Sequence, residues 1–184
     1  MSCVSKLHSR CFLGRKTLLL TDAGTSRPVL GPPLYVPEPI SKLSMRVKDI
    51  YDMLHGGAIP EFNPVRSTFV DVRDVATLVL RAVEQDAAAS AAAEKSSNRA
   101  SRGKNRYLLV GQSPVSPQTM ADILRARYPD RVDIIQEGTP GQTYPDMTWR
   151  FASSKAGELL GREWIGLEKS VVDSAEVFLT PENY

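Results

Sequence analysis

A strand-like segment that runs directly into a helix is the feature that most constrains the fold of this 184-residue chain. Arg66–Val72 contains the β-branched and aromatic residues that favour extended structure, with Val70 and Val72 on one side of the strand. Asp74 follows, and aspartate is a preferred N-cap, here for a helix predicted over Val75–Gln85. Arg106–Val110 is again strand-like. Strands that alternate with helices predict an α/β fold.

Apolar spacing and end signals predict four more helices. Ser116 and Pro117 are a typical N-cap and first helical residue, and Gly161 is a typical helix end. In the last helix we expect the apolar residues to be buried, Val172 among them. These helices are expected over about residues 41–54, from residue 117 onward, from residue 154 to Gly161, and over about residues 167–179.

Two short strands complete the prediction, over Thr17–Leu20 and Val132–Gln136. The expected architecture is therefore a partial Rossmann-type α/β fold, a short mixed sheet with about five helices. Residues 1–26 are predicted to be a poorly defined N-terminal segment, and residues 27–184 the folded part. Residues 86–104 form a low-complexity loop; their alanine run could instead extend the preceding helix.

Composition excludes several classes of protein. With 23 Lys and Arg against 21 Asp and Glu, the formal net charge is +2, which argues against a histone-like or strongly acidic protein. The basic cluster between Lys95 and Arg106 lacks interleaved aromatic residues, so we expect a solvated loop and no nucleic-acid partner. No apolar run is long enough to span a bilayer. Cys3 and Cys11 predict free thiols in a reducing, cytoplasmic compartment, although the acid-poor N-terminus leaves a transit peptide as an alternative.

No local catalytic or metal-binding constellation is found along the chain. The 12 glycines form none of the loops that cradle a pyrophosphate, and no tyrosine has a lysine four residues later. A nucleophile elbow is absent, and His8 and His55 are far apart. Asp71 and Asp74 could be an acid/base pair, but helix capping explains Asp74 more simply. We therefore predict no catalytic residue and no metal site.

Several segments, in this order, resemble the C-terminal part of an extended short-chain dehydrogenase/reductase. The closest branch contains dihydroflavonol reductases, cinnamoyl-CoA reductases and fungal methylglyoxal reductases. The matching segments are Val29-Leu30-Gly31-Pro32-Pro33-Leu34 (a V-x-G-P loop), Phe69-Val70-Asp71-Val72-Arg73-Asp74-Val75-Ala76, Arg106-Tyr107-Leu108-Leu109-Val110, Ser154-Lys155-Ala156 with Leu159-Leu160-Gly161, and Leu167-Glu168-Lys169-Ser170. Two positions depart from the pattern, since Ser26 stands where relatives carry proline and Ala152 where they often carry aspartate.

The resemblance implies an NADP- or NAD-dependent oxidoreductase that transfers hydride to a small carbonyl substrate, an aldehyde or a ketone. It places Val29 and Gly31 beside the nicotinamide, and it makes the helix at 41–54 and the loop at 56–66 walls of the substrate pocket. It assigns no individual substrate-binding residue. Members of the family carry a nucleotide-binding half first, with the Gly-rich turn and the Tyr-x-x-x-Lys pair, and neither motif occurs here.

Two expectations about function follow from this absence. The first is a truncated descendant or fragment of a carbonyl reductase, folded as its substrate-binding lobe and inactive alone. A related alternative is that the real gene product is longer than this sequence. The second is a non-catalytic binding or interaction protein. Apolar faces that pack against the other half in relatives would then be exposed and would invite a protein partner or self-association.

Overall fold

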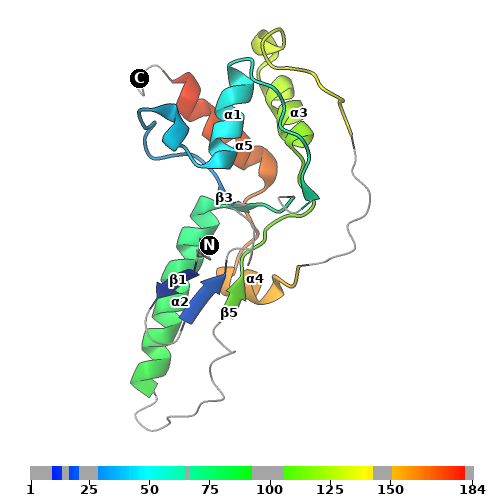
Figure 1. Ribbon diagram of the computed structural model, residues 1–184. Coiled ribbons are helices and arrows are strands. Elements are labelled where there is room, and N and C mark those ends of the chain that lie inside the picture. Colours follow the sequence, from blue (N-terminus) through cyan, green and yellow to red (C-terminus); the bar gives the residue numbers. More distant parts are fainter. Residues whose placement is uncertain are drawn as a thin grey trace, which may run out of the picture.

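The computed structural model describes residues 10–13, 17–20, 29–64, 67–92, 106–142 and 151–180 (Figure 1). Side chains are described for the same residues except 10–13, 17–20 and 86–92. The strands are β1 (Arg10–Leu13), β2 (Thr17–Leu20), β3 (Val29–Leu30), β4 (Val70–Asp71) and β5 (Arg106–Leu108). The α-helices are α1 (Met45–Leu54), α2 (Val72–Ala92), α3 (Pro117–Arg127), α4 (Ser154–Leu160) and α5 (Leu167–Leu179), and short 3-10 helices cover Ile40–Lys42 and Pro129–Arg131.

The strands form two small sheets. In the first, the order is β1-β2-β5, with β1 antiparallel to β2 and β2 parallel to β5. In the second, β3 and β4 are parallel, with Val29 opposite Val70. A parallel pair needs a crossover connection, and α2 lies in the chain between β2 and β5. The α/β class with a mixed sheet and five α-helices, predicted from the sequence, is confirmed for the described residues.

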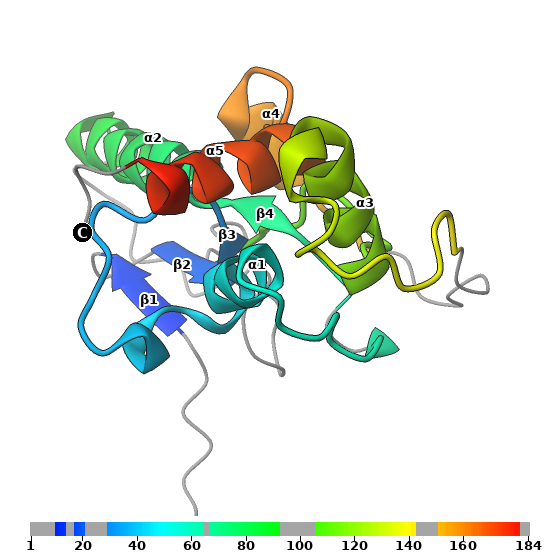
Figure 2. The same ribbon diagram turned by 90° about the horizontal axis from the view of Figure 1, so that it is seen from above.

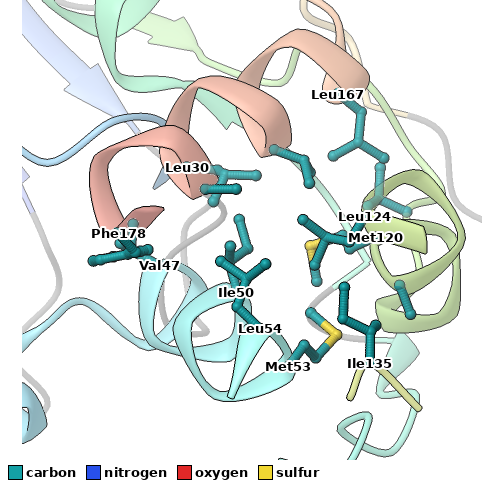
Figure 3. Close-up of a cluster of buried hydrophobic side chains, with 14 of the residues drawn as sticks. Leu30, Val47, Ile50, Met53, Leu54, Met120, Leu124, Ile135, Leu167 and Phe178 are labelled. Atoms are coloured by element: carbon teal, nitrogen blue, oxygen red, sulfur yellow. The ribbon is translucent and has the colours of Figure 1, made fainter. Parts of the chain in front are cut away.

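Two apolar clusters hold the elements together. The helices of the first, α1, α3 and α5, lie in the upper half of Figure 1 and are seen from above in Figure 2, while α2, α4 and β5 of the second lie in the lower half of Figure 1. The first joins α1, α3 and α5, whose buried side chains meet in Figure 3; they include Ile50, Leu54, Leu124 and Phe178. The second joins α2, α4 and β5 through Val70, Leu78, Ala82, Tyr107, Leu109, Ala156 and Leu160. Strand β3 connects the clusters, because Leu30 belongs to the first and Val29 packs against the second.

The strand predicted over Arg66–Val72 is shorter than expected, and the role predicted for Asp74 is wrong. Helix α2 already begins at Val72, so Asp74 lies in its first turn and is not its N-cap. The physical reason is Asp71, whose Oδ1 accepts a hydrogen bond from the backbone N–H of Arg73 at 2.8 Å, as a capping side chain does. Val72 consequently leaves the strand and is 39% exposed instead of sharing a side with Val70.

Helix α2 runs to Ala92, so the alternative in which the alanine run extends the helix is confirmed, and the low-complexity loop does not begin at residue 86. Alanine has the highest helix propensity, which explains why the alanine run continues the helix. Residues 93–105, where the rest of that loop was predicted, lie outside the described part. At the other end, the strand at Thr17–Leu20 is confirmed, but β1 beside it was not predicted and lies within the segment expected to be poorly defined.

The prediction of a strand over Val132–Gln136 is wrong. The segment forms turns after the 3-10 helix at Pro129–Arg131. The guanidinium of Arg125, in the last turn of α3, donates hydrogen bonds to the carbonyl oxygens of Val132 at 2.7 Å and Ile135 at 2.5 Å. Carbonyl groups bound to a side chain in this way do not need a neighbouring strand.

The predicted helix ends are largely confirmed. The hydroxyl of Ser116 accepts a hydrogen bond from the N–H of Thr119 at 3.0 Å, and Pro117 is the first residue of α3. Gly161 ends α4 with a left-handed φ of 62°. Helix α5 matches its prediction, except that Val172 is half-buried and not buried. Within the described residues, every helix is too short or too polar to cross a bilayer.

Candidate functional site

A small pocket lies between the first turn of α1, the loop that follows α1, and the start of α3. Its volume is about 50 Å³, which is room for a few non-hydrogen atoms, since one water needs about 10–15 Å³. Helix α1 and loop 60–63 both line it, so the segments that the resemblance makes walls of a substrate pocket do share a pocket. The lining residues are Met45, Arg46, Asp49, Pro60, Glu61, Asn63, Val115 and Pro117.

The wall contributed by α1 is charged although it is largely buried. The Arg46 side chain is 10% exposed, and its Nη1 lies 3.9 Å from Oδ2 of Asp49, one turn further along the helix. Opposite this pair, Val115 and the two prolines supply apolar surface. Four of the eight lining residues are charged or polar, and the pocket is far smaller than the roughly 300–1,000 Å³ of a typical small-molecule site. Sequence reasoning missed Arg46 and Asp49, because charged residues three positions apart on a helix are usually solvated.

Val29 and Gly31, predicted to lie beside the nicotinamide, stand at the junction between the two apolar clusters. Val29 is half-buried in β3, and Gly31 follows with φ at +137°, a conformation that L side chains rarely adopt. A Cβ at Gly31 would lie 2.7 Å from Cγ1 of Val72 and 3.3 Å from Oδ2 of Asp71. The glycine therefore lets the loop after β3 cross directly over the start of α2. Cofactor binding by these two residues stays a prediction.

The carboxylate of Asp71, below Gly31, is completely buried and fully engaged. It accepts hydrogen bonds from Nε of Arg73 at 2.9 Å, from Nη2 of Arg73 at 2.8 Å, and from the hydroxyl of Ser170 in α5. Arg73 also reaches Asp173 at 2.5 Å. Burial raises the pKa of Asp71, but the hydrogen bonds from Arg73 and Ser170 outweigh it and hold that pKa below its ordinary value. Asp71 is thus ionised and links α2 to α5 through its hydrogen bonds with Arg73 and Ser170.

The second carboxylate of this segment, Asp74, is also buried and serves the packing of the loop before α5. Its Oδ2 accepts a hydrogen bond from the N–H of Ile165 at 2.8 Å, and its Oδ1 lies 2.7 Å from Nη2 of Arg162. Asp71 and Asp74 therefore face different partners. This arrangement favours a structural role for both over an acid/base pair. Likewise, no three metal-binding side chains gather in the part of the chain that is described.

Gln118, in the first turn of α3, anchors the loop that follows the predicted but absent strand. Its Nε2 donates to the carbonyl of Glu137 at 2.8 Å, and its Oε1 accepts from the N–H of Thr139 at 3.0 Å. We expect Gln118→Ala to lower the free energy of unfolding by about 1–2 kcal/mol and to speed amide exchange at Thr139, because two backbone groups lose their partner. Denaturant titration and hydrogen exchange test this, with the exposed Gln136→Ala as control; equal effects of the two substitutions would contradict it.

Comparison with known proteins shows that the chain is similar to part of several reductases. No family model matches the chain. Over 151 residues it is 28% identical to a curated Candida albicans protein named as an NADPH-dependent methylglyoxal reductase, GRP2, a match that covers 79% of this chain and 39% of the relative.

Solved structures give the same result. The chain resembles Gre2 of Candida albicans in complex with NADPH, with a TM-score of 0.59, 26% identity, and coverage of 82% of this chain and 41% of that one. For the yeast methylglyoxal/isovaleraldehyde reductase Gre2, also complexed with NADPH, the TM-score is 0.60 at 23% identity, with coverage of 83% and 41%. The chain spans about two fifths of the length of these relatives.

The resemblance predicted from the sequence motifs is therefore confirmed. By sequence and fold, the chain is related to part of the carbonyl reductases of the short-chain dehydrogenase/reductase type. More particularly, the curated Candida albicans relative is named as an NADPH-dependent methylglyoxal reductase, which is one of the branches named by the motifs.

Proposed function

We propose that this chain is the substrate-binding lobe of an NADPH-dependent carbonyl reductase. The observation that carries the proposal is the match to such reductases over 79% of the chain. The pocket between α1 and loop 60–63 would receive part of a small aldehyde or ketone, and Val29 and Gly31 would lie beside the nicotinamide. NADP is favoured over NAD, since the relatives are named for NADPH. A cytoplasmic location is part of this proposal.

The lobe is proposed to be inactive when it is alone. Neither a Gly-rich phosphate loop nor a Tyr-x-x-x-Lys pair occurs in the sequence, and these are the motifs that would bind the pyrophosphate and protonate the carbonyl oxygen. We expect no NADPH oxidation above the protein-free rate with methylglyoxal, isovaleraldehyde or other aldehydes and ketones. Loss of NADPH fluorescence measures this, with Candida albicans Gre2 as the active control. Clear turnover by the chain alone would overturn this part of the proposal.

A second candidate function is a non-catalytic interaction protein built on the same lobe. Exposed apolar side chains on α2 favour it, because such side chains in line on one helix are typical of an interaction surface. Under this alternative the chain associates with itself or with another protein, and light scattering over a range of concentrations shows the assembly. A monomer of constant mass at all concentrations argues against self-association.

A further inference from the structure

The loop after β3 presents two large apolar side chains directly to solvent. Leu34 is 102% exposed and Tyr35 is 74% exposed, the two highest values among the large apolar residues of the described part. The chain is held on both sides of this pair, because Gly31 is buried against the start of α2 and Val36 packs against the first apolar cluster. Figure 1 and Figure 2 show the loop on the outer side of the molecule, between β3 and the 3-10 helix before α1. The exposed pair therefore belongs to a loop that is fixed at both ends.

Two prolines come directly before the exposed pair, so the segment is Pro32-Pro33-Leu34-Tyr35. Proline fixes φ at about −65°, and Pro33 keeps Pro32 out of the helical region, so both residues favour the polyproline II conformation. They lie in neither a helix nor a strand, and the chain bends at Leu34 and Tyr35. Both prolines are half-buried, so each keeps part of its ring at the surface. The loop thus presents a restricted, extended proline pair followed by an exposed tyrosine.

The chemistry of this segment fits a groove lined by aromatic side chains. Proline-rich segments dock in such grooves, and a preformed polyproline II segment loses little conformational entropy when it binds. Tyr35 adds a large ring with a hydroxyl at its tip, and tyrosine is one of the residues that most often dominate the energy of an interface. Because the loop is already held at Gly31 and Val36, binding requires little further ordering of the chain.

We propose that Pro32–Tyr35 is a docking segment for a protein that carries a WW domain, the small domain type whose aromatic groove binds Pro-Pro-x-Tyr sequences. An SH3 domain is the weaker partner, because its ligands carry Pro-x-x-Pro. Residues 28–40 contain five prolines, but no two of them are three positions apart. The Pro-Pro-x-Tyr motif occurs once in the sequence, so one domain is expected to bind each chain. This docking is independent of reductase activity and of the pocket beside α1.

Titration of the full chain into a dye-labelled WW domain that binds Pro-Pro-x-Tyr peptides tests the proposal, with fluorescence anisotropy as the readout. We expect saturable binding that Tyr35→Ala weakens at least about tenfold, as the loss of an interface hot spot does. The matched control is Leu34→Ala, because Leu34 is still more exposed than Tyr35 but occupies the position that the motif leaves open. Leu34→Ala should bind about as tightly as the natural chain. Circular dichroism checks that both variants are folded.

Three results would overturn the proposal. The first is a full chain that does not bind at concentrations where a peptide of residues 30–39 does, because the half-buried prolines are then out of reach of the groove. The second is binding that Tyr35→Ala leaves unchanged. The third is equal weakening by Leu34→Ala and Tyr35→Ala, which would indicate an unspecific apolar contact in place of recognition of the motif.

Discussion

Replacing Asp71 by alanine is expected to lower the free energy of unfolding by about 2–4 kcal/mol, because the donors that face this completely buried carboxylate lose their acceptor. The Asp71 carboxylate is completely buried and accepts hydrogen bonds from the backbone and side chain of Arg73 and from Ser170. Alanine would leave the guanidinium partnered only by Asp173 at the α2–α5 junction. Urea unfolding followed by circular dichroism measures the loss.

The matched control for this prediction is Asp173→Asn, which removes the other carboxylate bound to Arg73. Asp173 has a 20% exposed side chain, so water can replace part of what it loses, and we expect a clearly smaller effect. An Asp173→Asn protein as unstable as the Asp71→Ala protein would contradict the central position given to Asp71.

Acid should remove the same stabilisation without any mutation. The pKa of Asp71 is lower in the folded protein than its unfolded value of about 3.9, so its contribution is fully present above that pH. The contribution is lost as the pH falls from the unfolded pKa through the folded pKa, because between these two values the unfolded state binds one proton more than the folded state. We expect the stability of the natural protein to fall more steeply below about pH 4 than that of Asp71→Ala. Parallel curves for the two proteins would argue against this assignment.

Gly31→Ala is expected to lower the free energy of unfolding by about 2–6 kcal/mol, as the sum of about 1–3 kcal/mol of backbone strain and about 1–3 kcal/mol of steric overlap. Gly31 has φ at +137°, and an added Cβ would lie 2.7 Å from Cγ1 of Val72, above the Asp71 carboxylate. The methyl group would push the loop after β3 away from α2. Thermal and urea unfolding measure the loss of stability.

Gly141→Ala is the control that separates strain from overlap. Gly141 also has a left-handed φ, +67°, but an added Cβ would meet nothing within 4 Å. Gly141→Ala should therefore carry the backbone cost alone and be clearly milder. If the two substitutions cost the same, the close approach of the β3 loop to α2 is not what requires glycine at position 31.

Local signals in the sequence located most elements but not all of their ends. Ser116, Pro117 and Gly161 act through groups within a few residues, so their effects could be predicted without knowledge of the fold. Asp74 was assigned as an N-cap by the same reasoning, and the assignment is wrong. The capping hydrogen bond, from the N–H of Arg73 to Asp71, is itself local, but the contacts that hold Asp71 and Arg73 in place come from α5, about 100 positions away.

The candidate site, too, was predicted in part from the sequence and decided in part by the tertiary structure. Motifs in the sequence indicated the helix and the loop that border the pocket, but they did not reveal that Arg46 and Asp49 face it. The row of exposed apolar side chains on α2, which contains Val72, Leu80 and Val83, was predicted only as an unspecified exposed apolar face. Its position depends on where Arg81 meets α4 and where Gln85 meets β5, which periodicity along the helix does not contain.

By itself the sequence determined the α/β class, the relationship to carbonyl reductases and the absence of a Gly-rich loop and a Tyr-x-x-x-Lys pair, because composition, helix-end signals and motif order are local properties of the chain. Only the tertiary structure decided that Asp71 ties α2 to α5, that residues 132–136 form turns instead of a strand, and that Val72 begins an exposed apolar row. Each of these depends on a side chain whose partner lies elsewhere in the chain, and the burial and bonding of such a pair follow from packing.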